Sequence, residues 1–281
     1  MAAVWGNVEN LQKLWEWAKE NLTAKDVNKL LLGTDNEGKT AWLLAAKSGY
    51  LENLQKVWEW AKLKLTTVDI NNKLLLGTDC EGRTALHTTP LTGNLDVLLK
   101  VWEWAAEKPT TEEIHNKLLL GTDNEGRMAW HRAANRGKLE VVQKIWELAK
   151  KKLTTEDINR LLLGTDNDGI CAFHWATLIG NLDNSLKLWE GSKEKQITED
   201  IYKKFLLVPE FEGMTTCHWA AWTGNIDMIV KVQERAEKKL TREEINNNLL
   251  FCTDREGGTV FHKALKCSGL ELLQKLCTNI R

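Results

Sequence analysis

A short phrase recurs along the chain at a nearly constant interval, and this repeat limits the possible folds more than any other feature. The phrase Leu-Leu-Leu-Gly-Thr-Asp, or a weaker copy of it, begins at Leu30, Leu74, Leu118, Leu161, Phe205 and Leu249. The intervals are 44, 44, 43, 44 and 44 residues. Such a period is typical of supersecondary units that stack and share a core. The sequence therefore predicts a single repeat array over residues 1–281, without a linker or a second domain.

One unit, residues 33–76, is predicted to begin with a turn and a short first helix. Residues 33–38 contain two glycines and Asx residues, which favour turns. Residues 40–48 are apolar and rich in alanine, as expected of a short buried helix. Gly49 suits the position that directly follows a helix.

A longer second helix and a short third helix complete the unit. The apolar stripe of the second helix is Leu51, Leu54, Trp58, Ala61 and Leu65. Thr66 stands three residues before Asp69, the spacing of a capping box, and opens a third helix that ends at Leu76. The same spacing recurs at Thr23/Asp26, Thr110/Glu113, Thr154/Asp157 and Thr241/Glu244. The fourth full unit has Ile197 where the capping threonine is expected.

A second motif lies in the turn and first helix of most units. It reads Asp-x-x-Gly-x-Thr, an apolar residue, His, x, Ala-Ala, and its histidines are His87, His131, His174, His218 and His262. This pattern resembles the ankyrin repeat, whose signature is T-P-L-H-x-A-A. The resemblance implies an all-α, right-handed ankyrin-type solenoid. The proline is replaced here, and the period exceeds the family's 33 residues by about 10. Because the excess falls after the second helix, each repeat is expected to carry an extended second helix and an extra third one.

The repeat boundaries follow from the same alignment. Residues 5–11 align with residues 48–54, so the sequence starts inside a unit. This indicates either a cap or a fragment of a longer array. The predicted units are an N-terminal half-repeat 1–32, full repeats 33–76, 77–120, 121–163, 164–207 and 208–251, and a C-terminal partial repeat 252–281.

Composition narrows the class of protein. The chain has 38 basic and 39 acidic side chains, which argues against a broad footprint for nucleic acid or an anionic membrane. No apolar run approaches the roughly 20 residues that span a bilayer, and residues 1–17 lack the apolar core of a signal peptide. The six cysteines form no C-x-x-C pair, so neither a zinc site nor a disulfide framework is predicted. We expect a monomeric cytoplasmic protein without a cofactor.

One stretch matches a nucleotide-binding motif. Residues 33–40 fit G-x-x-x-x-G-K-[ST], the pattern of a phosphate-binding loop. Asp35 and Glu37 would, however, place two carboxylates in the phosphate cradle. The same loop recurs one unit later, with Arg83 in place of the lysine. We therefore interpret it as the turn of the repeat and predict no nucleotide binding.

The histidines and cysteines suggest packing rather than catalysis. The five motif histidines lie one repeat apart, too far to share a metal ion, and the resemblance implies that they hydrogen-bond the turn. Cys171 and Cys217 lie near a motif histidine at core-facing positions, so we expect both to be buried. His115 is expected to be solvated. No catalytic residues and no metal ligands are predicted.

Tryptophan forms two columns in the second helices. The first column reads Trp15, Trp58, Trp102, Trp146, Trp189 and then Gln233. The second, two residues later, reads Trp17, Trp60, Trp104, Leu148, Gly191 and Arg235. Residues two apart on a helix differ by about 200° around its axis, so the columns face different layers. We expect the first column in the main core and the second beneath the third helix, against residues such as Ile70.

The positions that ankyrin-like proteins use for binding change character along the chain. In the first three full units they are mostly polar and include Arg83, Arg127, Arg132 and Arg136. In the next two units they are apolar: Ile170, Trp175, Leu178, Ile179, Phe211, Met214, Trp219 and Trp222. Exposed aromatic residues grouped on one face predict a recognition patch. The alternative is that neighbouring units bury these side chains.

The resemblance implies a function as well as a fold. We expect a non-enzymatic interaction scaffold that binds a protein partner, of unknown identity, through the concave face of the repeats. The alternative is a regulatory or targeting segment of a larger signalling protein, channel or enzyme. A nucleotide-binding enzyme is a third hypothesis, and it would require ATP affinity that Lys39→Ala removes.

Overall fold

The regular structure of the chain is helical. The computed structural model describes residues 8–107, 111–136, 138–179, 211–238 and 240–267, together with 203, 206, 207 and 209. In these residues no strand forms, and the only β-type pairs are isolated bridges at two turns, Thr122 with Met128 and Thr165 with Cys171. The predicted all-α class is therefore confirmed. Contacts divide the chain into two compact units, Met1–Thr154 and Thr155–Arg281, and each is described by itself.

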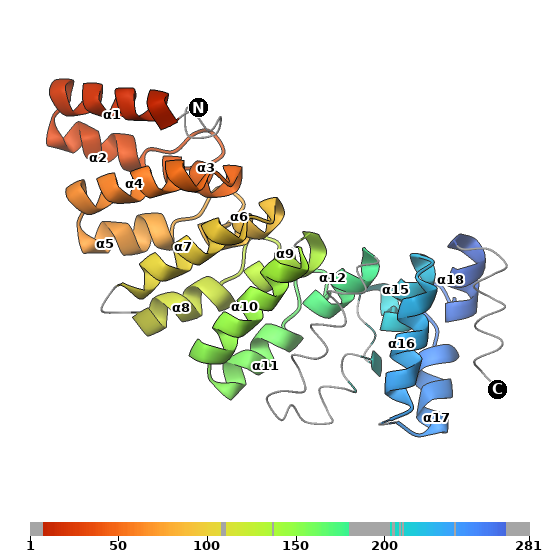
Figure 1. Cartoon of the computed structure of the whole chain (residues 1–281). Coiled ribbons are helices and arrows are strands. Elements are labelled where there is room, and N and C mark those ends of the chain that lie inside the picture. Colours follow the sequence, from red (N-terminus) through yellow and green to blue (C-terminus); the bar gives the residue numbers. More distant parts are fainter. Residues whose placement is uncertain are drawn as a thin grey trace. The chain divides into compact units, whose positions relative to one another are not determined.

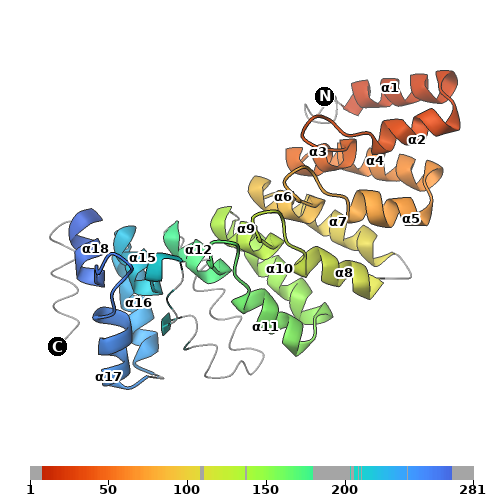
Figure 2. The same ribbon diagram turned by 180° about the vertical axis from the view of Figure 1, so that it is seen from behind.

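In the N-terminal unit three kinds of helix alternate along the chain (Figures 1 and 2). The first helices are α3 (Ala41–Ser48), α6 (Ala85–Thr92) and α9 (Ala129–Arg136). The second helices are α1 (Val8–Asn21), α4 (Leu51–Lys64), α7 (Leu95–Ala106) and α10 (Leu139–Lys152). The third helices are α2 (Ala24–Leu32), α5 (Thr67–Asp69) with the π-helix η1 (Ile70–Leu75), and α8 (Thr111–Leu120). α3 packs on α6 and α6 on α9, while α1 packs on α4 and α4 on α7.

The C-terminal unit repeats this order. It contains α11 (Thr155–Leu163), α12 (Ala172–Leu178), the 3-10 turn η2 (Phe211–Gly213), α15 (Thr216–Trp222), α16 (Ile226–Ala236), α17 (Arg242–Ile245) with the π-helix η3 (Asn246–Leu250), and α18 (Val260–Cys267). α12 packs on α15, and α15 packs on α18. Ile197, Trp189 and Gly191 lie outside the described residues, as does the helix predicted after α18.

The third helices begin where the threonines predict. The hydroxyl oxygens of Thr23, Thr66 and Thr241 accept a hydrogen bond from the backbone N–H three residues later, at 3.1–3.2 Å. Each hydroxyl satisfies one of the free N–H groups of a helix start. The sequence did not predict that two of these helices end in the wider π-turns of η1 and η3.

The first tryptophan column lies in the core, as expected. Trp15, Trp58, Trp102 and Trp146 are all buried. Trp58 also contacts Trp42 of α3, with ring centroids 5.5 Å apart. The second helix therefore fixes the position of the first helix through large apolar contacts.

The second column makes a contact that the sequence did not predict. Trp60 stacks on Trp15 of the preceding repeat, with ring centroids 4.5 Å apart and planes 7° from parallel. Trp104 stacks in the same way on Trp58, at 4.9 Å and 16°. A second helix between two others is buried on two opposite faces, so each column faces a different neighbour. Trp17, which meets no such ring among the described residues, is 53% exposed.

His115 also departs from expectation. Its ring is buried and stacks on Trp102, with centroids 4.1 Å apart. Burial lowers the pKa of this imidazole. The third helix α8 is thus joined to the second helix α7 by a ring contact, and the prediction of a solvated side chain is wrong.

Candidate functional site

The turns before the first helices share one geometry. In five of them, the Oδ1 atom of an aspartate accepts hydrogen bonds from the backbone N–H groups two and four positions later, at 2.7–3.1 Å; the aspartates are Asp35, Asp79, Asp123, Asp166 and Asp254. A glycine with φ between 72° and 78° closes each turn: Gly38, Gly82, Gly126, Gly169, Gly213 and Gly257. Only glycine adopts this region without steric cost. The predicted turn chemistry is confirmed.

The turn of the fifth full unit differs most from the others. The sequence has Glu210 where the other units have aspartate, and this residue lies outside the described residues. Glu212 adopts φ 60°, the only positive φ of a non-glycine residue in the described chain. Without the aspartate side chain to organise it, this turn uses a less favourable backbone conformation.

In the loop that matches a phosphate-binding motif, an aspartate side chain takes the backbone N–H groups that would bind a phosphate. Asp35 Oδ1 accepts the N–H groups of Glu37 and Lys39, each at 2.9 Å. Lys39 is buried, its ammonium pairs with Glu37, and burial lowers its pKa. A phosphate loop needs such amides and a lysine free for the ligand. Here both are used to hold the turn.

Two of the motif histidines, His87 and His218, connect a first helix to the next turn. His87 Nδ1 lies 2.8 Å from Thr84 Oγ1, and His87 Nε2 lies 3.1 Å from the carbonyl oxygens of Gly121 and Arg127. His218 repeats the contact with Gly258 O at 3.1 Å. Burial lowers the pKa of His87 to about 4. These neutral imidazoles therefore tie adjacent repeats together within each unit.

The buried Cys217 is poorly suited to act as a nucleophile. Cys171 and Cys217 are buried, and burial raises the pKa of the Cys217 thiol to about 12. A cysteine acts as a nucleophile only as the thiolate. Among the described residues no group of three His, Cys, Asp or Glu side chains could hold a metal ion. Nor is any helix in the described ranges long and apolar enough to cross a bilayer.

The predicted apolar patch is mostly covered. Ile170, Met214 and Trp219 form a buried cluster, with exposed fractions of 4%, 3% and 6%. Trp175 and Leu178 pack against this cluster and are partly buried. The expectation of an exposed surface is therefore wrong for Ile170, Met214 and Trp219, which the packing of α12 against α15 buries. The alternative, burial by neighbouring units, holds for the three cluster residues.

Two members of the patch do reach the surface. Ile179 is 44% exposed and Trp222 is 46% exposed. Lys263 Nζ lies 5.0 Å from the centre of the Trp222 ring, at cation–π distance. The side chain of Phe211 lies outside the described part of the structure. The surface that the structure provides is thus smaller than predicted.

The two large aromatic side chains at one repeat position differ in their polar contacts. Trp175 Nε1 donates a hydrogen bond to Asp166 Oδ2 at 2.8 Å. Trp219 occupies the same position in the next repeat, but its Nε1 has no partner among the described residues. The aspartate that would accept it is replaced by Glu210 in the sequence.

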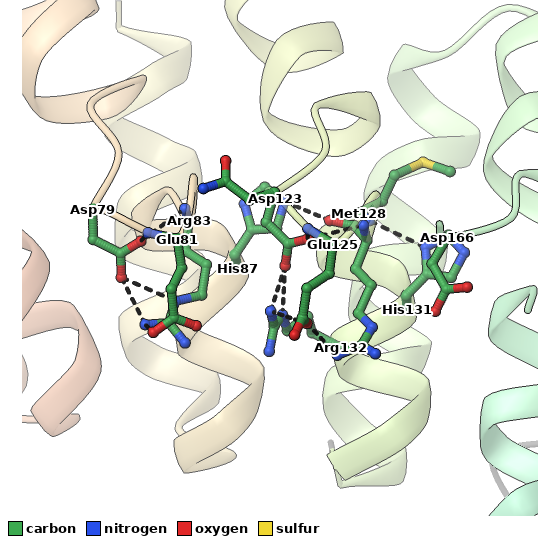
Figure 3. Close-up of polar contacts among 12 residues, drawn as sticks. Asp79, Glu81, Arg83, His87, Asp123, Glu125, Met128, His131, Arg132 and Asp166 are labelled. Atoms are coloured by element: carbon green, nitrogen blue, oxygen red, sulfur yellow. Dashed lines mark hydrogen bonds and ion pairs between the residues drawn. The ribbon is translucent and has the colours of Figure 1, made fainter. Parts of the chain in front are cut away.

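In the N-terminal unit the same repeat positions carry arginines (Figure 3). Arg132 corresponds to Trp175, and it donates from Nε to Asp123 Oδ2 at 2.8 Å. Arg83 donates from Nε to Asp79 Oδ2 at 2.9 Å. The sequence showed these residues as polar positions, but it did not indicate that they converge on one site. The 44-residue spacing of Arg83 and Arg127 was the signal that could have shown it.

Comparison with known proteins adds no family. No protein-family model and no curated protein sequence matches this chain. The fold and the site are therefore the basis of any functional assignment.

Proposed function

We propose that this chain is a non-enzymatic protein-interaction scaffold, built as a right-handed ankyrin-type solenoid with enlarged repeats. It binds a protein partner through the concave face formed by the turns and first helices. One observation supports this most strongly. The turn aspartates, glycines and histidines recur with one geometry, while the side chains between them change from arginine to large apolar residues.

A recurring frame with variable side chains is suited to recognition. Backbone hydrogen bonds join successive turns directly, from Cys80 N to Glu37 O and from Asn124 N to Glu81 O, both at 2.9 Å. Arg255 N to Glu212 O, at 2.8 Å, repeats this contact in the C-terminal unit. A surface fixed in this way loses little conformational entropy on binding, which favours affinity.

In the C-terminal unit the exposed residues of this face carry the proposed contact. Trp222 and Ile179 would enter the interface directly, with the partly buried Trp175 and Leu178 beside them. Tryptophan is enriched among the residues that dominate binding energy. Trp219, Met214 and Ile170 would instead support this surface from below.

The test is an affinity measurement with a matched control. Partners are captured with the intact chain, and their binding is then measured for Trp222→Ala, Ile179→Ala and Phe251→Ala. Phe251 is 56% exposed and lies at the end of a third helix, outside the first helices. We expect the first two changes to weaken binding by at least about tenfold, and Phe251→Ala to leave it unchanged. Equal effects of all three, or loss with Phe251→Ala alone, would exclude this face as the binding surface.

A further inference from the structure

A polar hollow lies in the N-terminal unit, beside the turns and first helices of two successive repeats. Its volume is about 190 Å³, and its lining consists of Arg83, Leu91, Arg127, Arg132, Asn135 and Arg136. Arg83 and Arg127 follow the two turns, and the other residues belong to α6 and α9. Four cationic side chains thus line the hollow, and none of its described lining residues is an aspartate or a glutamate.

Buried carboxylates hold two of these arginines in place. The side chains of Asp79 and Asp123 are 1% and 0% exposed, and they accept hydrogen bonds from Arg83 and Arg132. A guanidinium carries five N–H donors in a rigid fork. One edge of each fork is therefore fixed to the protein, while other donors remain toward the hollow.

Two glutamates that do not line the hollow pair with three of its arginines. Glu81 pairs with Arg83, and Glu125 pairs with both Arg127 and Arg132. Their side chains are 50% and 52% exposed, so these ion pairs stabilise the fold little. An anion from outside can replace either glutamate at small cost.

Arg136 supplies positive charge that the protein does not neutralise. It is exposed at the end of α9 and forms no ion pair with any other described residue. The glutamates and aspartates of the two turns pair with the other three arginines. Arg136 is thus the lining arginine that an incoming anion can pair with while the carboxylates of the two turns stay in place.

We propose that this hollow binds an oxyanion, a carboxylate or a phosphate, carried by an acidic segment of the protein partner. This rests on the proposed function, because the ligand is part of a bound protein. Arginine recognises both groups through two parallel hydrogen bonds, which lysine cannot form. Leu91 offers an apolar contact for the stem of the ligand's side chain.

The sequence distribution of arginine supports this choice of chemistry. No arginine precedes Arg83, and every basic side chain before it, including Lys39 at the equivalent repeat position, is lysine. At this position the two repeats that follow Arg127 have Ile170 and Met214. Four of the chain's nine arginines line this hollow.

The test titrates the intact chain with three blocked peptides, Gly-Leu-Xaa-Leu-Gly, in which Xaa is glutamate, phosphoserine or glutamine. Binding is followed by the Nε–Hε NMR signals of arginine at low salt. We expect the glutamate peptide, the phosphoserine peptide or both to shift the signals of the lining arginines, and the glutamine peptide to shift none. Which of the two binds more tightly identifies the source of the anion.

Variants separate this site from general charge attraction. Arg136→Ala should weaken binding at least about fivefold, because it removes a direct contact. Arg160→Ala makes an equal change of charge on α11, and it should alter binding less than about twofold, because salt screens its long-range attraction for the peptide. Glu81→Gln with Glu125→Gln should strengthen binding about threefold, because the competing anions are removed. Equal weakening by Arg136→Ala and Arg160→Ala, no preference over the glutamine peptide, or weaker binding after the glutamate changes would overturn the proposal. The proposed function, tested through Trp222, would be unaffected by any of these results.

Discussion

At the same repeat positions, the N-terminal unit has cationic side chains and the C-terminal unit has large apolar ones. In the N-terminal unit the turn position and the outward positions of the first helix carry Arg127, Arg132 and Arg136. In the C-terminal unit the matching residues are Ile170, Trp175 and Ile179. The backbone beneath them is the same, because the aspartate and the glycine of each turn keep their bonds and their φ values. The turn aspartates and glycines thus set the backbone, while the outward side chains set the chemistry of the surface.

One repeat position shows how this separation works. Arg132 and Trp175 both donate a side-chain N–H to the Oδ2 atom of the turn aspartate nine residues earlier. A guanidinium and an indole thus perform the same structural task while presenting a cation in one unit and an aromatic ring in the other. A change of binding chemistry at this position does not require a change of fold.

The largest expected effect concerns the buried part of the apolar face. Trp219→Ala should lower the free energy of unfolding by about 3–5 kcal/mol, because it empties a buried cluster that includes Met214 and Ile170. Trp222→Ala, at a residue 46% exposed, should change stability by less than about 1 kcal/mol. Urea unfolding of both variants makes the comparison. If Trp222 proved the costlier residue, the division into a buried cluster and an exposed surface would be incorrect.

A smaller effect is expected from acid, through the histidine ties of the N-terminal unit. His87 has its pKa lowered from 6.5 to about 4 by burial, although Asp123 opposes this shift. Between these two values the unfolded chain binds more protons than the folded chain, so stability falls as the pH drops from about 6.5 to about 4. The loss from His87 should reach about 3 kcal/mol.

Unfolding at pH 7 and at pH 4.5 measures this loss. In His87→Gln the difference between the two pH values should shrink by a similar amount, since glutamine does not titrate. An unchanged pH dependence in the variant would show that His87 is not held neutral in the folded chain.

The smallest expected effects concern two side chains that donate hydrogen bonds to turn aspartates, Arg132 and Trp175. Burial alone would raise the pKa of Asp123, but the hydrogen bond from Arg132 keeps it below its ordinary value. Arg132→Met should therefore destabilise by about 2 kcal/mol, as for a hydrogen bond between charged groups. Trp175→Phe removes only a neutral donor to Asp166 and should cost about 1 kcal/mol. Thermal unfolding of both variants tests the order, and a larger loss for Trp175→Phe would reverse our ranking of the two contacts.

The frame was largely predictable from the sequence, because it depends on local chemistry. A threonine three residues before an acid predicts a helix start, and an aspartate before a glycine at fixed spacing predicts the turn. These signals lie within a few residues of one another. They identified Thr66 and Gly82 correctly without any knowledge of tertiary structure.

The faces were less predictable, because they depend on how closely neighbouring repeats approach. Trp175 and Trp222 are both tryptophans on first helices, yet only Trp222 is exposed. The stacking of Trp60 on Trp15 also needs the position of the preceding helix, which no single repeat contains. The arginine hollow was missed for the same reason, since its lining comes from two repeats.

The central claim is that the turns and first helices form the binding face, and site-specific photocrosslinking tests it most directly. A photoreactive phenylalanine analogue is placed in the intact chain at Trp222, at Ile179 or at Leu63, which is 75% exposed on α4. We predict that the first two positions crosslink to a partner protein and that position 63 does not. Crosslinking at position 63, with none at positions 179 and 222, would contradict the account.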